Sequence, residues 1–340
     1  MTYREIINRT KSQLHSSISW WPVCFYHFTD IHNALGILDK GWIYGRNDAV
    51  KNSLMQSDNA SKSVIDVTNE FVKDYGRLYF RPLTPTQFHN EGYKPEHVRQ
   101  SAINASCPVP VFFCLDAETV LNTEGVGFVE CGLAGKSHHA LQQGEEAYAN
   151  LNFAKIYHNG WFEKGGDITQ YRHSEVVRAG GIPTQGAIKR IFCRTPAEKQ
   201  TLLYLLKNQL PHKAAQASRY IVYSPSLAMF YDNGICVKTV SGSEQGLYIE
   251  FNEAAKRYGR GSVRGDGKDL SVSITLYWLH PEKSAIVHRE DYGAYLDYSD
   301  ANAVNVHFEK CYSDRVLAEI FFDGCLMFKS EVDLKTQQLV

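Results

Sequence analysis

The 340-residue sequence lacks the patterns that mark several common classes of protein. Its eight cysteines lie far apart and none forms C-x-x-C, so the zinc-knuckle and thioredoxin spacings are absent. The longest apolar runs, such as residues 109–115, are far too short to span a bilayer, and the N-terminus has no apolar leader run. We therefore expect a cytoplasmic protein with free thiols, no metal and no membrane partner.

An excess of either charge is missing too. Thirty-six Lys and Arg residues against 37 Asp and Glu residues give a formal net charge of -1, so any basic surface must be local. The sequence has no G-x-G-x-x-G after a strand, no P-loop, no H-E-x-x-H and no G-x-S-x-G, which argues against the corresponding enzyme classes. A hydrophobic content of 44% is enough for a sizeable core and excludes wholesale disorder.

The first half of the chain predicts short strands with a few helices. Residues 23–29 predict a strand, followed by a short helix that begins near Ile31 and ends at Gly41. Residues 46–74 are polar and predict a long loop that could carry one helix near residues 64–73. Further strands are predicted at residues 77–81, 109–115, 127–130, 175–177 and 188–193.

The second half reads mainly as β-structure after one helix. Thr195 to Glu198 form a capping box with proline at the first helical position, which predicts a helix that ends at Pro211. From residue 219 onward, strand-like runs alternate with turn residues. These runs lie at residues 220–223, 246–251, 270–279, 285–288, 304–308 and 318–322.

Four short motifs carry the signal for function. Tyr26-His27-Phe28-Thr29 is an aromatic-His-x-Thr strand, and the helix start that follows contains Asn33. Tyr79-Phe80-Arg81-Pro82 is an aromatic pair before a proline, and Arg172-His173-Ser174-Glu175-Val176-Val177 places a glutamate at the start of an aliphatic strand. In this order the motifs resemble the DarT family, NAD-dependent ADP-ribosyltransferase toxins that modify bases in single-stranded DNA. The resemblance covers about residues 20–195.

The resemblance implies a fold and a reaction. The fold would be α+β, with the split β-sheet core and NAD cleft of ADP-ribosyltransferases over residues 1–212, and a β-rich domain or extension over residues 213–340. NAD would be a substrate that loses nicotinamide, with Glu175 as a catalytic residue. Among the remaining motif residues, those expected to bind NAD are His27, Thr29, Asn33 and Tyr79.

Elementary chemistry supports these assignments. Breaking the nicotinamide–ribose bond builds positive charge on the anomeric carbon, which a nearby carboxylate such as Glu175 would stabilise. The same carboxylate could serve as general base. His27 and Thr29 could donate to ribose hydroxyls and the carboxamide, and Tyr79 could stack on the nicotinamide ring. The ordinary alternatives are a strand-core His27 and Tyr79, and a solvent-facing Glu175 in a salt bridge with Arg172 or Arg178.

One position departs from the family pattern. The family carries an arginine in the loop before the aromatic-proline strand. In this chain, the basic residues between Arg46 and Arg77 are all lysines. We expect Arg46 to replace it as a catalytic residue, with Lys62 and Arg77 as the next candidates. A lysine cannot reproduce the planar fork of an arginine. The departure leaves the acceptor base open.

The clearest local basic feature is the glycine-rich run at residues 256–268. We expect it to bind nucleic acid, because a flexible cationic loop can follow a phosphate backbone while an aromatic ring stacks on a base. The candidates are Arg257, Tyr258, Arg260 and Arg264. The alternative is a solvated hairpin tip. An acceptor base must be unpaired or flipped, which favours a single-stranded substrate.

The sequence thus predicts a mono-ADP-ribosyltransferase toxin that acts on a base of single-stranded nucleic acid, with DNA favoured by the resemblance. An antitoxin protein is the expected partner. One alternative is the same chemistry on RNA or messenger RNA in a phage-defence toxin-antitoxin system. Another is a module that binds nucleic acid or protein without turnover.

Overall fold

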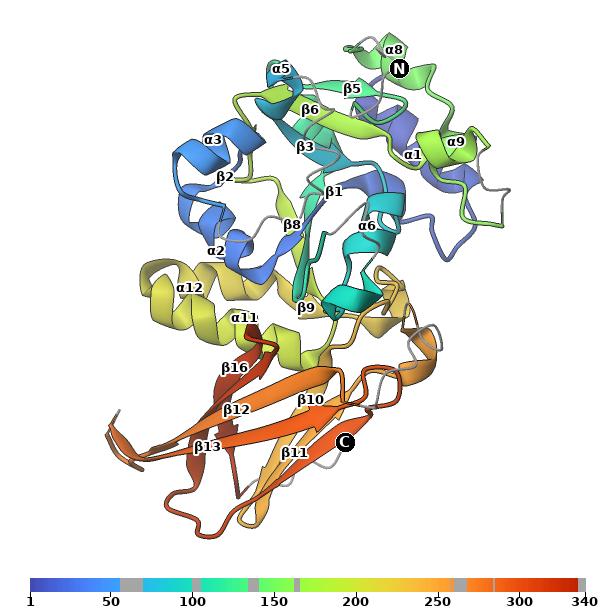
Figure 1. The fold of residues 1–340 in the computed structure, drawn as a ribbon. Helices are drawn as coiled ribbons and strands as arrows, with labels where there is room; N and C mark the ends of the chain where they lie inside the picture. The colour runs from blue at the N-terminus through green and yellow to red at the C-terminus, as the bar shows by residue number, and fades with distance from the viewer. Residues whose placement is uncertain are drawn as a thin grey trace.

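The computed structural model describes residues 1–55, 70–99, 105–133, 141–161, 166–257, 259, 268–283 and 285–335. The described chain has two parts, which Figure 1 shows one above the other. The first part is built around a seven-stranded sheet with helices about it, and the second contains a three-stranded and a four-stranded sheet. The α+β class and the β-rich C-terminal region predicted from the sequence are confirmed.

The seven-stranded sheet has the order β5-β6-β3-β1-β4-β8-β9. Its strands are β1 Cys24–Asp30, β3 Tyr75–Tyr79, β4 Pro110–Asp116, β5 Gly127–Val129, β6 Glu175–Ala179, β8 Ile188–Cys193 and β9 Ile221–Tyr223. All neighbours run antiparallel except β8 and β9, which are parallel. A small separate sheet pairs β2 (Trp42–Ile43) with β7 (Ile182–Pro183).

The large sheet splits in its middle. Strand β1 pairs with β4 along its whole length, from Cys24 to Asp30. With β3 on its other side, β1 shares the single register pair Tyr26 and Tyr79. The two strands therefore diverge next to the residues that the sequence singles out for chemistry.

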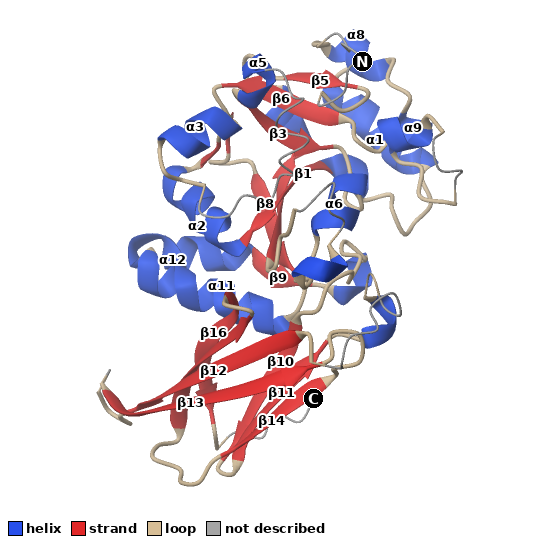
Figure 2. Cartoon of the chain, viewed as in Figure 1, coloured by secondary structure: helices blue, strands red, loops and turns tan. Residues whose placement is uncertain are grey.

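Helices surround this sheet in the first part (Figure 2). They are α1 Tyr3–Gln13, α2 Ile31–Lys40, α3 Arg46–Lys51, α5 Glu70–Lys73, α6 Pro85–Asn90, α7 Ala117–Leu121, α8 Glu145–Ala149, α9 Phe153–Ile156, α10 Ile168–Tyr171, α11 Pro196–Gln209 and α12 Pro211–Ala217.

Local chemistry explains the helix that follows β1. The Asp30 side chain accepts a hydrogen bond from the His32 backbone N–H and so caps the N-terminus of α2. Gly41 takes φ = 72° and ends it, a backbone conformation that glycine adopts without a Cβ penalty. Helix α2 therefore begins directly after the last residue of β1 and has a defined end at Gly41.

Three sequence expectations need correction. Residues 46–51, expected in a loop, form α3, and most of the helix expected near residues 64–73 lies outside the described residues. The helix predicted from the capping box is confirmed, but Pro211 begins α12 instead of ending helical structure, because proline fits the first turn. Residues 221–223, expected with the C-terminal strands, pair with β8 in the first sheet.

Residues 237–335 form what we call the C-terminal β region. Its three-stranded sheet contains β10 Val237–Ser243, β11 Gly246–Phe251 and β14 Ala303–His307. Its four-stranded sheet, in the order β13-β12-β15-β16, contains β12 Leu270–Leu279, β13 Ile286–Leu296, β15 Arg315–Phe322 and β16 Cys325–Asp333. Every second residue of β12 is buried, as expected for a strand with one face on a core. Strands β10 and β16 were not predicted.

The two parts share one apolar core. Helix α11 lies at the junction (Figure 1), and its Leu202 and Leu206 belong to the same buried cluster as Phe328 of β16. The Lys329 backbone N–H donates to the Thr201 hydroxyl at 3.1 Å. A division after residue 212 would fall inside α12. Because β9 belongs to the seven-stranded sheet, a boundary after β9 agrees better with the division into sheets. The two-domain division itself remains a proposal.

Two further expectations concern thiols and membranes. All eight cysteines are free, six of them buried. Within the described ranges, none of the helices combines the length and apolar character that crossing a bilayer requires.

The shared core predicts cooperative unfolding. Leu206→Ala should cost about 2–5 kcal/mol, because it opens a cavity in a fully buried layer of α11. Denaturant unfolding followed by circular dichroism should remain a single transition at a lower midpoint. Leu203→Ala on the same helix is the control and should cost less, because Leu203 is partly buried. Separate transitions for the two parts would contradict a shared core.

Candidate active site

The imidazole of His27 fills the split between β1 and β3. Its Nδ1 lies 3.1 Å from the backbone carbonyl oxygen of Arg77. A carbonyl can only accept, so Nδ1 carries the proton and Nε2 keeps a lone pair. Burial lowers the pKa of His27 to about 4, so the ring is neutral at neutral pH. The donor role expected of His27 is thus corrected: toward a ligand, Nε2 is an acceptor.

Glu175 lies at the first position of β6, where it is 4% exposed. Its Oε2 accepts a hydrogen bond from the Leu133 backbone N–H at 2.9 Å, and its Oε1 lies 3.8 Å from Nη1 of Arg77. Burial raises the pKa of Glu175, and the Arg77 charge and the Leu133 N–H oppose that rise. The carboxylate is therefore buried, held from two sides and poorly solvated.

A solvent-facing Glu175 is thereby excluded. The alternative interpretation paired it with Arg172 or Arg178. Arg172 instead donates from Nη2 to the Gly160 carbonyl at 3.0 Å. Arg178 donates to the carbonyls of Glu124 and Gly181, each at 2.8 Å.

Arg77 connects the two candidate residues. Its backbone carbonyl accepts the His27 hydrogen bond, and its guanidinium faces Glu175. A third contact, from Nη2 to the Val72 carbonyl at 3.0 Å, fixes the side chain. The sequence analysis had ranked Arg77 behind Arg46. The missing signal is the β3–β6 register, which pairs Tyr79 with Glu175 and so puts Arg77 on the same face.

Arg46 occupies a different place. It is the first residue of α3, and it is partly exposed. The turn of α3 that carries it is docked on the residue before β3, because Asn47 donates to the Asp74 carboxylate at 2.8 Å. The structure thus supplies Arg77 as the ion-pair partner of Glu175, and a catalytic role for Arg46 stays a prediction.

Tyr79 is the register partner of Tyr26 on one side and of Glu175 on the other. Its hydroxyl lies next to the side chain of Thr86 on α6, which opposes a rise in the pKa of Tyr79. Burial and the Glu175 charge raise the pKa of Tyr79 to about 12, so the phenol stays protonated. Its ring packs against an apolar cluster on this face of the sheet, made of Cys24, Tyr26, Phe112, Cys114, Phe192 and Met229.

The other two residues expected to bind NAD lie nearby in the chain. Thr29 is buried on β1, opposite Val111 of β4. Asn33 lies in the first turn of α2, directly after β1, and is partly buried. Strands β1, β3 and β6 are neighbours in the sheet, so His27, Thr29, Tyr79 and Glu175 all lie on the strands beside the split.

The part of the basic loop that the structure describes does not match the prediction. Arg257 is 3% exposed, and its guanidinium donates to the carbonyls of Asn252, Tyr298 and Ala301 at 2.6, 2.6 and 2.5 Å. It ties together segments of the C-terminal β region, so the prediction that it binds nucleic acid is wrong. The other members of the set lie outside the described residues: Tyr258, Arg260 and Arg264.

One exposed aromatic residue was not predicted from the sequence. Trp161 is 86% exposed, the most exposed of the large hydrophobic side chains in the described chain. Its neighbour Gly160 is held by Arg172, three residues before Glu175, and Nη2 of Arg172 also lies 3.4 Å from Nδ1 of His158. A single tryptophan in a polar segment gives no sequence signal, because its exposure depends on long-range packing.

Metal ligands do not cluster in the part of the chain that the structure describes: no group of three or more His, Cys, Asp or Glu side chains is placed to hold an ion. The site is therefore built from strand residues, one arginine and one buried carboxylate.

Comparison with known proteins places this site in a family. A family model described as "ssDNA thymidine ADP-ribosyltransferase, DarT" matches residues 26–227. The comparison with curated proteins finds no match.

Three solved structures are similar to the chain at low sequence identity. Thermus sp. 2.9 DarT in complex with NAD+ is 15% identical with a TM-score of 0.45, covering 62% of this chain and 98% of its own. Thermus sp. 2.9 DarT in complex with ADP-ribosylated ssDNA is 16% identical with a TM-score of 0.47, covering 62% and 97%. Thermosipho africanus DarTG in complex with ADP-ribose is 15% identical with a TM-score of 0.44, covering 64% and 52%.

The family match spans more than half of the chain and contains His27, Arg77, Tyr79 and Glu175. The chain therefore belongs to the DarT family and is an NAD-dependent ADP-ribosyltransferase.

Proposed function

We propose that the chain transfers ADP-ribose from NAD to a thymidine of single-stranded DNA and releases nicotinamide. The family description supports this acceptor. The observation that carries the proposal is the buried Glu175 carboxylate, held by Arg77 at the split where His27 also lies. A negative charge in such a place suits a reaction that develops positive charge on a sugar carbon.

Glu175 supplies the electrostatic part of catalysis. As the bond from the anomeric carbon to nicotinamide breaks, its electron pair leaves with nicotinamide and the ribose becomes cationic. The Glu175 carboxylate stabilises that cation more than the ground state, in which the positive charge lies on the nicotinamide ring. A base nitrogen then forms the new bond to the same carbon, and its proton passes to Glu175. The raised pKa of Glu175 suits this transfer.

The neighbouring residues orient the dinucleotide. Nε2 of His27 accepts a hydrogen bond from a ribose hydroxyl or from the carboxamide N–H, since Nδ1 is committed to Arg77. The Tyr79 ring stacks on the nicotinamide. Its hydroxyl remains protonated and lies next to Thr86. Thr29 and Asn33 complete the binding set. The polar groups about the split fit a ligand rich in hydroxyl and amide groups.

The acceptor strand is proposed to meet the protein at Trp161 and Arg172. An exposed indole offers a flat surface on which a base can stack without sequence preference, and a guanidinium can pair with a phosphate. Arg172, three residues before Glu175, donates to the carbonyl of Gly160, and Trp161 follows Gly160 directly in the chain. This arrangement supports a single-stranded substrate, because a paired base has no free face.

Modification of DNA bases would harm the cell that makes the enzyme. We therefore extend the proposal to a toxin that is restrained by an antitoxin protein. Action on RNA in phage defence is the alternative acceptor, and the labelling experiment below includes RNA for that reason.

Glu175→Gln should abolish transfer while leaving the fold intact. Removal of the negative charge should reduce the rate by about 10²–10³-fold or more. The measurement is incorporation of label from NAD into single-stranded DNA or RNA. Glu331→Gln, which changes an exposed carboxylate of β16, is the matched control and should label like wild type. Label in RNA but not in DNA would overturn the proposed acceptor, and full activity of Glu175→Gln would overturn the mechanism.

The same substitution should make the protein more stable at neutral pH. The pKa of Glu175 is raised above its ordinary value of 4.5, so the ionised form is disfavoured in the fold and stability falls as pH rises through the folded-state pKa. The neutral Gln avoids this cost, and its advantage should vanish at a pH below 4.5. Thermal melts of both proteins across pH provide the check. A lower melting temperature for Glu175→Gln at pH 7 would contradict a destabilising carboxylate.

Trp161→Ala should weaken the acceptor complex and spare NAD. Loss of a base-stacking contact of about 1–3 kcal/mol corresponds to a rise of about 5- to 150-fold in KM for an oligonucleotide. KM for NAD should not change, and Trp161→Phe should restore part of the affinity. Tyr295→Ala, which removes an exposed aromatic ring from β13, is the control. An unchanged oligonucleotide KM in Trp161→Ala would remove Trp161 from the acceptor site.

A further inference from the structure

The chain between β9 and β10, residues 224–236, runs across the face of the first sheet. We call it the crossing segment. Met229 is 3% exposed within the apolar cluster that Tyr79 packs against, and the ring of Phe230 lies 5.4 Å from that of Phe112. Ala228 and Asp232 have φ values of 41° and 59°, which side-chain-bearing residues rarely adopt. Such a path needs firm contacts to hold it.

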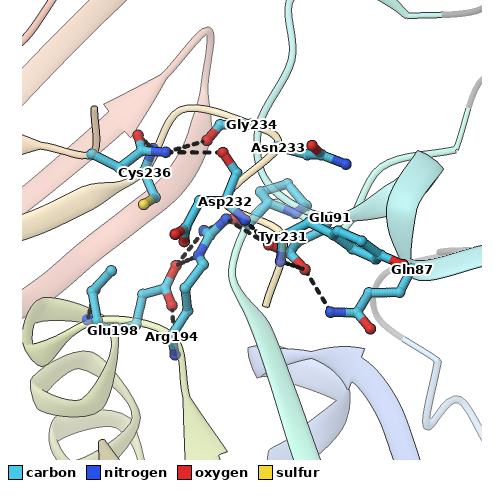
Figure 3. A network of polar contacts seen from close by, with 12 residues as sticks. Gln87, Glu91, Arg194, Glu198, Tyr231, Asp232, Asn233, Gly234 and Cys236 are labelled. Carbon is cyan, nitrogen blue, oxygen red and sulfur yellow. Dashed lines mark hydrogen bonds and ion pairs between the residues drawn. The ribbon is translucent and has the colours of Figure 1, made fainter. Parts of the chain in front are cut away.

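Glu91 supplies those contacts (Figure 3). Its Oε2 accepts from the Tyr231 backbone N–H at 3.0 Å, and its Oε1 accepts from the Asp232 backbone N–H at 2.7 Å. Glu91 is 0% exposed, and Nη1 of Arg194 lies 3.9 Å from Oε1. A buried carboxylate that takes two successive amides fixes both the position and the conformation of the segment.

Helix α6 joins these contacts to the active site. Gln87 on this helix donates to Glu91 at 2.7 Å and to the Met229 carbonyl at 2.8 Å. The preceding residue, Thr86, lies next to the Tyr79 hydroxyl, and Tyr79 packs against the cluster that contains Met229. Adjacent residues of one short helix therefore face the crossing segment and the site.

Tyr231 connects the crossing segment to the residues that follow β3. Its hydroxyl donates to the Leu83 carbonyl at 2.7 Å, while the Leu83 N–H donates to Oε1 of Gln87 at 2.7 Å. Leu83 lies four residues after Tyr79 and has φ = 59°. Both backbone groups of this strained residue are thus held by side chains, one of them from the crossing segment.

We propose that Glu91 is a positioning residue for Tyr79: by fixing the crossing segment on α6, it sets Tyr79 against Glu175 and makes the C-terminal β region part of the catalytic unit. The family match ends at residue 227, before Tyr231 and Asp232, so this linkage belongs to the extension of this chain. The inference rests on the proposed function insofar as Tyr79 contacts the nicotinamide.

A purely structural Glu91 would behave differently. It would lower the melting temperature without changing turnover by the molecules that remain folded. A positioning Glu91 changes turnover at temperatures well below melting, and it does so through Tyr79. Hydrolysis of NAD, in which water takes the place of the base and nicotinamide is released, reports on this without a nucleic-acid acceptor, so the result does not depend on whether DNA is the substrate.

The test is Glu91→Gln in the full chain. The substituted amide presents N–H groups where Tyr231, Asp232 and Gln87 already donate, so at least one contact is lost. We expect nicotinamide release to fall by about tenfold, with a higher KM for NAD. Tyr231→Phe, which removes one hydroxyl, should fold readily and show a smaller effect in the same direction; wild-type kinetics in this variant would overturn the proposal even if Glu91→Gln did not fold.

A double-mutant cycle tests whether Glu91 affects turnover through α6 and Tyr79. Thr86→Val removes the hydroxyl next to that of Tyr79, so its effect on kcat/KM should be less than additive with that of Glu91→Gln. Tyr93→Phe is the control, because it removes another hydrogen bond between the two parts, at 2.5 Å to Asp323, without touching α6. It should change stability and leave kinetics unaltered. Strict additivity, or equal kinetic effects of the control, would overturn the proposal.

Discussion

The cost of burying an ionised carboxylate shapes the active site. Glu175 has lost nearly all of its water, and in return it receives one amide hydrogen bond and an arginine at 3.8 Å. A complete set of donors would neutralise the carboxylate so well that a cation beside it would gain little. With these two contacts, the negative charge of Glu175 is incompletely stabilised. A developing oxocarbenium ion would complete the stabilisation, which is why the same incomplete solvation that raises the pKa favours the reaction.

The split in the sheet follows from the same strands. Where β1 leaves β3, the Arg77 carbonyl has no strand partner on that side, and the imidazole of His27 takes the partner's place. One side chain thus satisfies the backbone carbonyl that the split leaves without a strand partner. Because its pKa is about 4, the ring keeps this tautomer throughout the range in which proteins normally work. The opening is therefore preorganised before any ligand arrives.

The sequence could predict those parts of the site that depend on local pattern. The aromatic strand at β1, the capped α2 and the aliphatic strand after Glu175 each carry their own periodicity or capping signal, and they place His27 and Glu175 correctly. Arg77 could not be ranked, because its nearness to Glu175 depends on the register of two strands that are about 100 residues apart. The burial of Arg257 was also hidden, since two of its three carbonyl acceptors lie more than 40 residues onward, at Tyr298 and Ala301.

The joint between the two parts shows the same limit of pattern reading. Glu91, Arg194 and Glu198 look like surface residues in sequence, yet all three are buried. Arg194 stands between the two carboxylates, bonded to Glu198 at 3.1 Å, and burial raises the pKa of Glu198 to about 7. Such a network adds little net stability compared with apolar packing, but it tolerates few alternative arrangements. This buried network fixes the orientation of the C-terminal β region relative to the catalytic sheet. Positioning of Tyr79 depends on that fixed orientation more than on the stability that the network contributes.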